Sequence, residues 1–80
     1  FPSGRFLKAA RVGLGLSPDE VAEEAGISRA SLSRLEAGSL AVSVKVADSV
    51  RRVLESHGVR FLTGDGAFGP SIRFPADYES

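Results

Sequence analysis

A very short connection between two helix-forming segments, residues 26–28, constrains the fold of this chain most. The first segment starts at Ser17, whose hydroxyl can cap a helix, and Glu20 three residues later completes the pattern of a capping box. Gly26 ends this segment, because glycine adopts a left-handed backbone conformation at little cost. Ser28 then opens a second helix. A glycine-containing turn this short sets two helices at a steep angle.

Helical periodicity continues on both sides of this pair. Before it, Leu7, Ala10 and Leu14 form one apolar stripe behind a candidate cap at Ser3, and Gly13 and Gly15 are expected to mark the helix end. After it, Ser43 caps another amphipathic segment that Gly58 terminates. The pattern therefore predicts four helices in residues 1–58. Their inward-facing residues are Leu7, Ala10, Leu14, Val21, Ala22, Ala25, Leu32, Leu35, Val46, Val50, Val53 and Leu54.

The periodicity changes from helical to alternating at residue 59. A glycine-rich run over residues 64–70 separates two short strand-forming segments, which is typical of a β-hairpin. We therefore expect a mainly α domain at 1–58, a hairpin at 59–75 and a flexible tail at 76–80.

Composition excludes several classes of protein. The chain has no cysteine, so it can form neither a disulfide framework nor a thiolate metal site. Its apolar stretches are too short to span a membrane and no secretory signal is visible, which favours a cytoplasmic protein without membrane partners. The missing initiator methionine is expected either of a trimmed chain or of a fragment of a longer protein. His57 has no second histidine or cysteine beside it, and no catalytic constellation can be assembled. We expect no metal, no cofactor and no enzymatic activity.

The formal net charge of zero counts mildly against nucleic-acid binding. The charges are unevenly distributed, however, because four acids fall within residues 19–24. A neutral total is therefore compatible with one basic face. The basic residues on either side of the acids include Arg5, Lys8, Arg11, Arg29, Arg34, Lys45, Arg51 and Arg52.

Three runs together resemble the phage-repressor/Cro-like (XRE-type) helix-turn-helix family: residues 14–17 (LGLS), 21–28 (VAEEAGIS) and 32–38 (LSRLEAG). The resemblance covers roughly residues 4–57. It implies a four-helix, lambda-repressor-like domain, here followed by a β-hairpin. It also implies a sequence-specific, DNA-binding transcriptional regulator that binds a palindromic or pseudopalindromic operator as a dimer. Residues 28–37 would form the recognition helix in the major groove of double-stranded DNA.

The resemblance also assigns DNA contacts. The positions that would read bases are Arg29, Ala30, Ser33 and Arg34. Arginine suits bidentate bonding to guanine, alanine suits contact with a thymine methyl group, and serine can bond to several bases. The residues that would contact phosphate are Arg11, Ser17, Ser28, Ser31, Ser43 and Lys45. In relatives, the pair matching Arg11 and Glu36 forms a salt bridge that leaves the arginine near a phosphate.

The chain departs from the family in two places. Pro18 occupies a position where relatives often carry a DNA-contacting glutamine, and residues 39–42 lack the basic side chains common there. Both departures predict weaker non-specific affinity for DNA.

An isolated hairpin is marginally stable and exposes an open edge, so we expect this one to form a homodimer interface. Two other functions remain open. One is an antitoxin-like module that binds DNA and also a protein partner through the C-terminal segment. The other is a protein-interaction adaptor that has lost DNA binding. The residues expected to dimerise are Val59, Phe61, Ile72 and Phe74.

Overall fold

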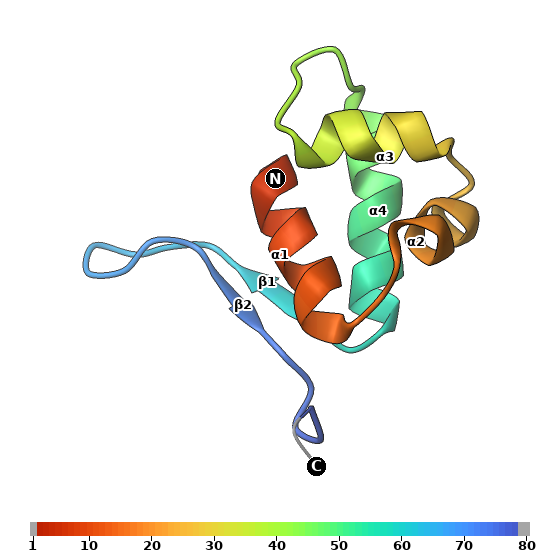
Figure 1. Ribbon diagram of the computed structural model, residues 1–80. Coiled ribbons are helices and arrows are strands. Elements are labelled where there is room, and N and C mark those ends of the chain that lie inside the picture. Colours follow the sequence, from red (N-terminus) through yellow and green to blue (C-terminus); the bar gives the residue numbers. More distant parts are fainter. Residues whose placement is uncertain (1, 79–80) are drawn as a thin grey trace.

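The computed structural model describes residues 2–78, and this part of the chain contains four helices followed by a two-stranded antiparallel hairpin (Figure 1). This arrangement confirms the mainly α fold predicted from the sequence. The elements are α1 (Gly4–Leu14), α2 (Pro18–Ala25), α3 (Arg29–Glu36), α4 (Val44–Ser56), β1 (Arg60–Leu62) and β2 (Ser71–Arg73).

Each of these helices begins after a serine whose hydroxyl oxygen accepts a hydrogen bond from a backbone amide three residues later. The N–O distances lie between 3.0 and 3.3 Å. At Ser17 the capping box is complete, because the Glu20 carboxylate also accepts from the Ser17 amide at 3.3 Å. A capping serine typically contributes about 1 kcal/mol relative to alanine. The predicted helix starts are therefore confirmed. The caps are Ser3, Ser17, Ser28 and Ser43.

The core lies between the four helices and also includes Val59, three residues after the end of α4. Val59 is only 1% exposed, because the hairpin returns across the helical body. The core therefore joins the predicted helical domain to the base of the hairpin. Its largest fully buried side chains are Leu7, Leu32, Leu54, Val21, Val50 and Val59.

Two glycines of α1 allow other segments of the chain to pack closely against this helix. A Cβ atom at Gly4 would lie 1.7 Å from the carbonyl oxygen of Leu35, so the start of α1 touches the end of α3. A Cβ atom at Gly13 would lie 2.5 Å from the Phe74 ring. Gly13 therefore does not mark the helix end: α1 continues through it to Leu14, and Gly15 forms the left-handed cap. The sequence cannot distinguish these two roles, because Phe74 is distant in the chain.

The hairpin is anchored at its base and free at its tip. Phe61 pairs with Ile72 across the two strands, and both side chains pack on the core together with Phe74. Beyond the strands, residues 63–70 project from the helical body, and we call them the arm (Figure 1).

Tyr78 stacks on Phe74 with ring centroids 4.5 Å apart, and its amide donates to the Pro75 carbonyl. Residues 76–78 of the predicted tail thus form a turn, whereas 79 and 80 lie outside the described residues. Within residues 2–78, no helix combines the length and apolar character that crossing a membrane requires.

Candidate nucleic-acid interface

The turn between α2 and α3 is held by backbone hydrogen bonds and by burial. Gly26, at a φ of +70°, closes α2, and the Ile27 amide donates to the Ala22 carbonyl at 3.0 Å. Val21 and Ala22 are buried beneath this turn, so α2 packs closely against its neighbours. The direction of α3 is therefore set by its N-terminal connection.

The helix α3 buries one face and exposes another. Leu32 and Leu35 point into the core. The opposite side carries no large apolar side chain, and the four residues predicted to read bases are all exposed there. They are Arg29, Ala30, Ser33 and Arg34. A rigidly connected second helix with exposed arginine, alanine and serine is the arrangement by which helix-turn-helix domains present residues to the major groove.

Arg29 has an acidic neighbour that the sequence did not predict. Its Nη1 lies 3.5 Å from a carboxylate oxygen of Asp19, and both side chains are more than half exposed. An ion pair this long and this exposed contributes little to stability. Arg29 can therefore leave Asp19 for a base or a phosphate at small cost.

Arg11 and Glu36 form the salt bridge that the family resemblance implies. Nε and Nη2 of Arg11 donate to the two carboxylate oxygens of Glu36 at 2.7 and 3.0 Å. Nη1 donates to the Leu16 carbonyl at 3.0 Å, and the side chains are 10% and 9% exposed. The pair ties α1 to the C-terminal end of α3, so its positioning role is clear from the geometry, while phosphate contact by Arg11 stays a prediction.

A hollow of about 270 Å³ lies beside α3, and basic groups surround it. Lys8 joins Arg11 and Arg29 there, although the sequence reading placed no role on Lys8. Lys8 stands three residues before Arg11, on the same side of α1, which is the signal that identifies it in retrospect. This hollow therefore collects three cationic side chains. Its lining residues are Lys8, Arg11, Pro18, Arg29, Leu32, Ser33, Glu36 and Ala37.

The predicted phosphate-contacting serines all serve as helix caps or lie next to one. The Ser28 hydroxyl accepts from the Ser31 amide and lies 3.0 Å from the Ser31 hydroxyl oxygen. Ser43 caps α4, whose first turn carries the exposed Lys45, and the start of α4 lies on the same side of the molecule as α3 (Figure 1). Ser17 is already engaged in its capping box.

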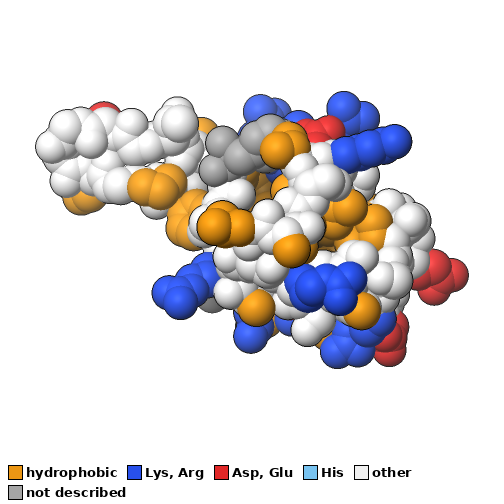
Figure 2. All heavy atoms as spheres, turned by 90° about the horizontal axis from the view of Figure 1, so that it is seen from above, with side chains coloured by type: hydrophobic (Ala, Val, Ile, Leu, Met, Phe, Trp, Pro, Cys, Tyr) orange, Lys and Arg blue, Asp and Glu red, His pale blue; other side chains and the backbone are white. Residues whose placement is uncertain are grey.

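The distribution of charge explains how a neutral chain can present basic groups to a partner. In the view from above, Lys and Arg side chains stand at several places around the edge of the molecule, and Asp and Glu side chains occupy less of that face (Figure 2). The acids of α2, in contrast, are concentrated in one helix. Net charge therefore does not describe the surface around α3. Among residues 2–78, no three His, Cys, Asp or Glu side chains gather as a metal site would need.

Fold and exposed helix together define a helix-turn-helix DNA-binding domain. The sequence matches the family profile described as helix-turn-helix over residues 7–58, which is more than half of the chain. The protein therefore belongs to the XRE-type helix-turn-helix family, a family of DNA-binding transcription regulators. No curated protein matches the sequence.

Proposed function

We propose that this protein is a sequence-specific transcription regulator that binds a palindromic or pseudopalindromic operator as a homodimer, with α3 in the major groove. The observation that carries the proposal is the exposed face of α3, which presents Arg29, Ala30, Ser33 and Arg34 from a helix fixed at both ends. The turn fixes its N-terminal end, and the buried pair of Arg11 with Glu36 fixes its C-terminal end. A preorganised helix loses little conformational freedom when it binds.

Phosphate contacts would position this helix. Positive charge lies at and beside α3, on Arg29 at its start and on Lys8 of α1. The first turn of α4 adds Lys45 and backbone amides. Such groups fix the register of a protein on DNA without reading its sequence. Arg11 has already committed three donors within the chain, so it contributes to this surface mainly by holding Glu36 and the end of α3.

A dimer suits this function, because two-fold related domains read half-sites about 34 Å apart. Among the side chains expected to dimerise, Val59 is already covered by its own chain, and Phe61, Ile72 and Phe74 are partly covered. The part of the hairpin left for a partner is therefore its outer face and its arm.

Selection of bound sequences from random DNA tests the proposal. We expect enrichment of an inverted repeat whose half-site centres are separated by about one helical turn or a multiple of it. The double variant Arg29→Ala/Arg34→Ala should lose this enrichment, whereas Arg52→Ala, on the exposed side of α4, should retain it. Absence of any enriched motif with the unaltered chain would contradict DNA reading and favour the adaptor function.

A further inference from the structure

The tip of the arm is a rigid turn. The Asp65 amide donates to the Phe68 carbonyl at 2.8 Å, and the Asp65 carboxylate accepts from the amides of Ala67 and Phe68, each at 2.8 Å. The hydrogen bonds from Phe68 and Ala67 lower the pKa of Asp65 below its ordinary value, because they stabilise the ionised carboxylate. The three hydrogen bonds that stabilise the tip thus all lie within the arm itself.

Phe68 stands on this tip and is 76% exposed. A rigid turn that displays a phenyl ring pays little conformational entropy when the ring is buried by a partner. Aromatic side chains of this kind typically anchor protein interfaces. Phe68 makes no ring contact within residues 2–78, which leaves its apolar surface available.

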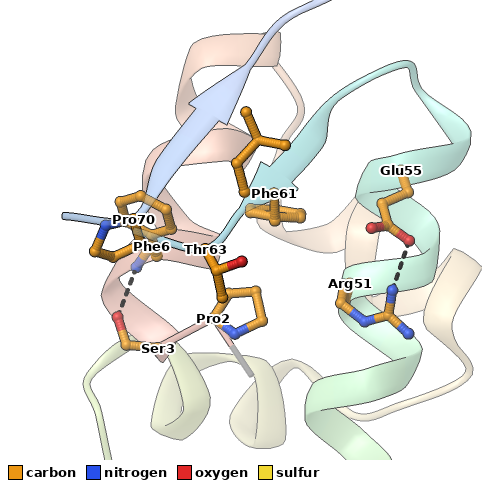
Figure 3. A pocket seen from close by; sticks show the side chains of 9 residues that line it. Pro2, Ser3, Phe6, Arg51, Glu55, Phe61, Thr63 and Pro70 are labelled. Carbon is orange, nitrogen blue, oxygen red and sulfur yellow. Dashed lines mark hydrogen bonds and ion pairs between the residues drawn. The ribbon is translucent and has the colours of Figure 1, made fainter. Parts of the chain in front are cut away.

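The base of the same arm borders a hollow of about 350 Å³ (Figure 3). The rings of Phe6 and Phe61 lie on its walls with centroids 6.3 Å apart. Arg51 and Glu55 of α4, joined at 2.7 Å, form the wall across from Ser3 and Pro70 (Figure 3). A mainly apolar hollow of this size can accept one aromatic side chain. Its lining residues are Pro2, Ser3, Phe6, Arg51, Glu55, Phe61, Leu62, Thr63 and Pro70.

Two arginines face each other at the base of the hairpin. Arg60 is the cross-strand partner of Arg73, both are exposed, and neither forms an ion pair within residues 2–78. Like charges directly opposite in a hairpin are destabilising unless an acid approaches them. Asp65, at the tip, is the single charged residue between these two arginines along the chain. The hairpin is thus acidic at one end and basic at the other.

We propose that two copies of this chain pair arm to arm about a two-fold axis, each inserting Phe68 into the hollow between Phe6 and Phe61 of the other. The same arrangement brings each Asp65 toward Arg60 and Arg73 of the opposite copy. This inference deepens the proposed function, since it names the surface through which the regulator dimerises.

One symmetry operation satisfies both the apolar and the charged match. When two hairpins lie antiparallel, the tip of each comes to rest at the base of the other. The three residue steps from Leu62 to Asp65 span about 10 Å of extended chain, so the tip of one hairpin can reach the base of an antiparallel neighbour. Both strands of a two-stranded hairpin also have open edges on which a second hairpin can pair. An isologous contact of this kind closes on itself as a dimer.

Removal of the phenyl ring provides the first test. Phe68→Ala should weaken the dimer about 10–100-fold in sedimentation experiments over a micromolar concentration series, because it removes the anchor of the interface. Leu40→Ala is the matched control, because Leu40 is fully exposed and lies far from the arm in sequence. Two results would overturn the proposal. One is an unaltered chain that is still monomeric at about 100 µM, a concentration at which a specific dimer should form. The other is a Phe68→Ala chain that dimerises as tightly as the unaltered one.

Engineered disulfides test the geometry, because the natural sequence is free of cysteine. Pro2→Cys places a thiol at the hollow, and Ala67→Cys places one at the arm tip. A mixture of the two single variants should oxidise to a covalent heterodimer, whereas each variant alone should remain largely uncrosslinked. Disulfide-linked homodimers of the Ala67→Cys variant alone would indicate that the two tips meet each other, and this would contradict the proposed arrangement.

The charge match has its own signature. Arg60→Gln/Arg73→Gln should weaken the dimer and flatten its salt dependence, although it relieves the repulsion within each hairpin. Lys8→Gln is the control, since it removes a positive charge away from the arm. These measurements contain no DNA, so they stand or fall independently of operator binding. If the chain selects an inverted repeat but all these variants dimerise as the unaltered chain does, only the proposed arm-to-arm interface is refuted.

Discussion

Arg29 is the most direct to test of the residues that we propose read bases, because only one weak ion pair engages its side chain within residues 2–78. Arg29 is the first residue of α3, and its long, exposed contact with Asp19 leaves the guanidinium free to turn toward a partner. We predict that Arg29→Ala costs about 1–3 kcal/mol of binding free energy on the selected operator and relaxes one base position. Fluorescence anisotropy with operator and random duplexes measures both effects. Equal losses on the two duplexes would show that Arg29 contacts phosphate alone.

Lys8 provides the complementary prediction at this scale. Lys8 lines the hollow beside α3 and is not among the residues that we propose read bases. Lys8→Gln should therefore weaken binding to all DNA sequences alike. The slope of log K against log salt should become shallower by about one unit. A binding titration at several salt concentrations checks this, and an unchanged slope would remove Lys8 from the interface.

Arg11 and Glu36 are the buried charges whose loss should affect folding rather than binding. In Glu36→Gln the Arg11 guanidinium keeps its charge in a buried place without a full partner. Breaking such a pair from one side costs about 3 kcal/mol or more of unfolding free energy. Urea unfolding followed by circular dichroism measures the change. Asp19→Asn, which breaks an exposed pair, is the control and should leave the urea midpoint nearly unchanged.

At the scale of elements, the contact between α1 and the hairpin depends on the absence of a side chain at Gly13. Gly13→Ala places a methyl group where the Phe74 ring lies, so we expect it to destabilise the protein. In a Phe74→Ala background the same substitution should stabilise it by about 0.5–1 kcal/mol, because alanine is the better helix former. Thermal unfolding of the four chains completes a double-mutant cycle. The same sign in both backgrounds would contradict the contact.

The arm tip should be sensitive to acid. Because the folded pKa of Asp65 is lowered, its contribution to the turn is fully present above the ordinary pKa of 3.8 and is lost as the pH falls through the folded value. Amide hydrogen exchange at Ala67 and Phe68 should therefore accelerate at acidic pH beyond its intrinsic change. Asp65→Asn keeps an accepting oxygen without a titrating proton, so its tip should lack this extra acceleration.

At the scale of the whole molecule, our proposals assign DNA reading to the helical body and the pairing of two copies to the arm. Replacing residues 64–69 by an Asn-Gly turn shortens the arm but keeps β1, β2 and the buried Val59. We expect this chain to fold, to remain monomeric and to bind one half-site. The loss of the second half-site should reduce operator affinity about 10²–10⁴-fold. Persistence of the dimer after this change would place the interface on the helical body.

Local patterns were sufficient to predict most of the helical architecture. The capping serines and Gly26 specify where helices begin and end through contacts within three or four residues, and the structure has them in these roles. The pair of Arg11 with Glu36 was predicted as well, but only through the family resemblance, since 25 residues separate the two side chains.

The remaining features depend on segments that meet only after folding. No local pattern encodes the tertiary contacts that bring these segments together. They are the packing of Phe74 on Gly13, the ion pair of Arg29 with Asp19 and the hollow beside Phe6. Lys8 was missed for the same reason. Its position beside Arg11 becomes meaningful only when α1 and α3 are placed together.

The close approach of Gly4 to the Leu35 carbonyl has a consequence for large-scale mutagenesis. Any side chain at position 4 must displace the end of α3 or the start of α1, because the added carbon would overlap a backbone oxygen. In a library screened for operator binding, position 4 should thus tolerate as few amino acids as the positions that we propose read bases. A parallel screen for protein abundance should separate the two groups. Variants at Gly4 would score low in both screens, whereas variants at Arg29 would lose operator binding and keep their abundance.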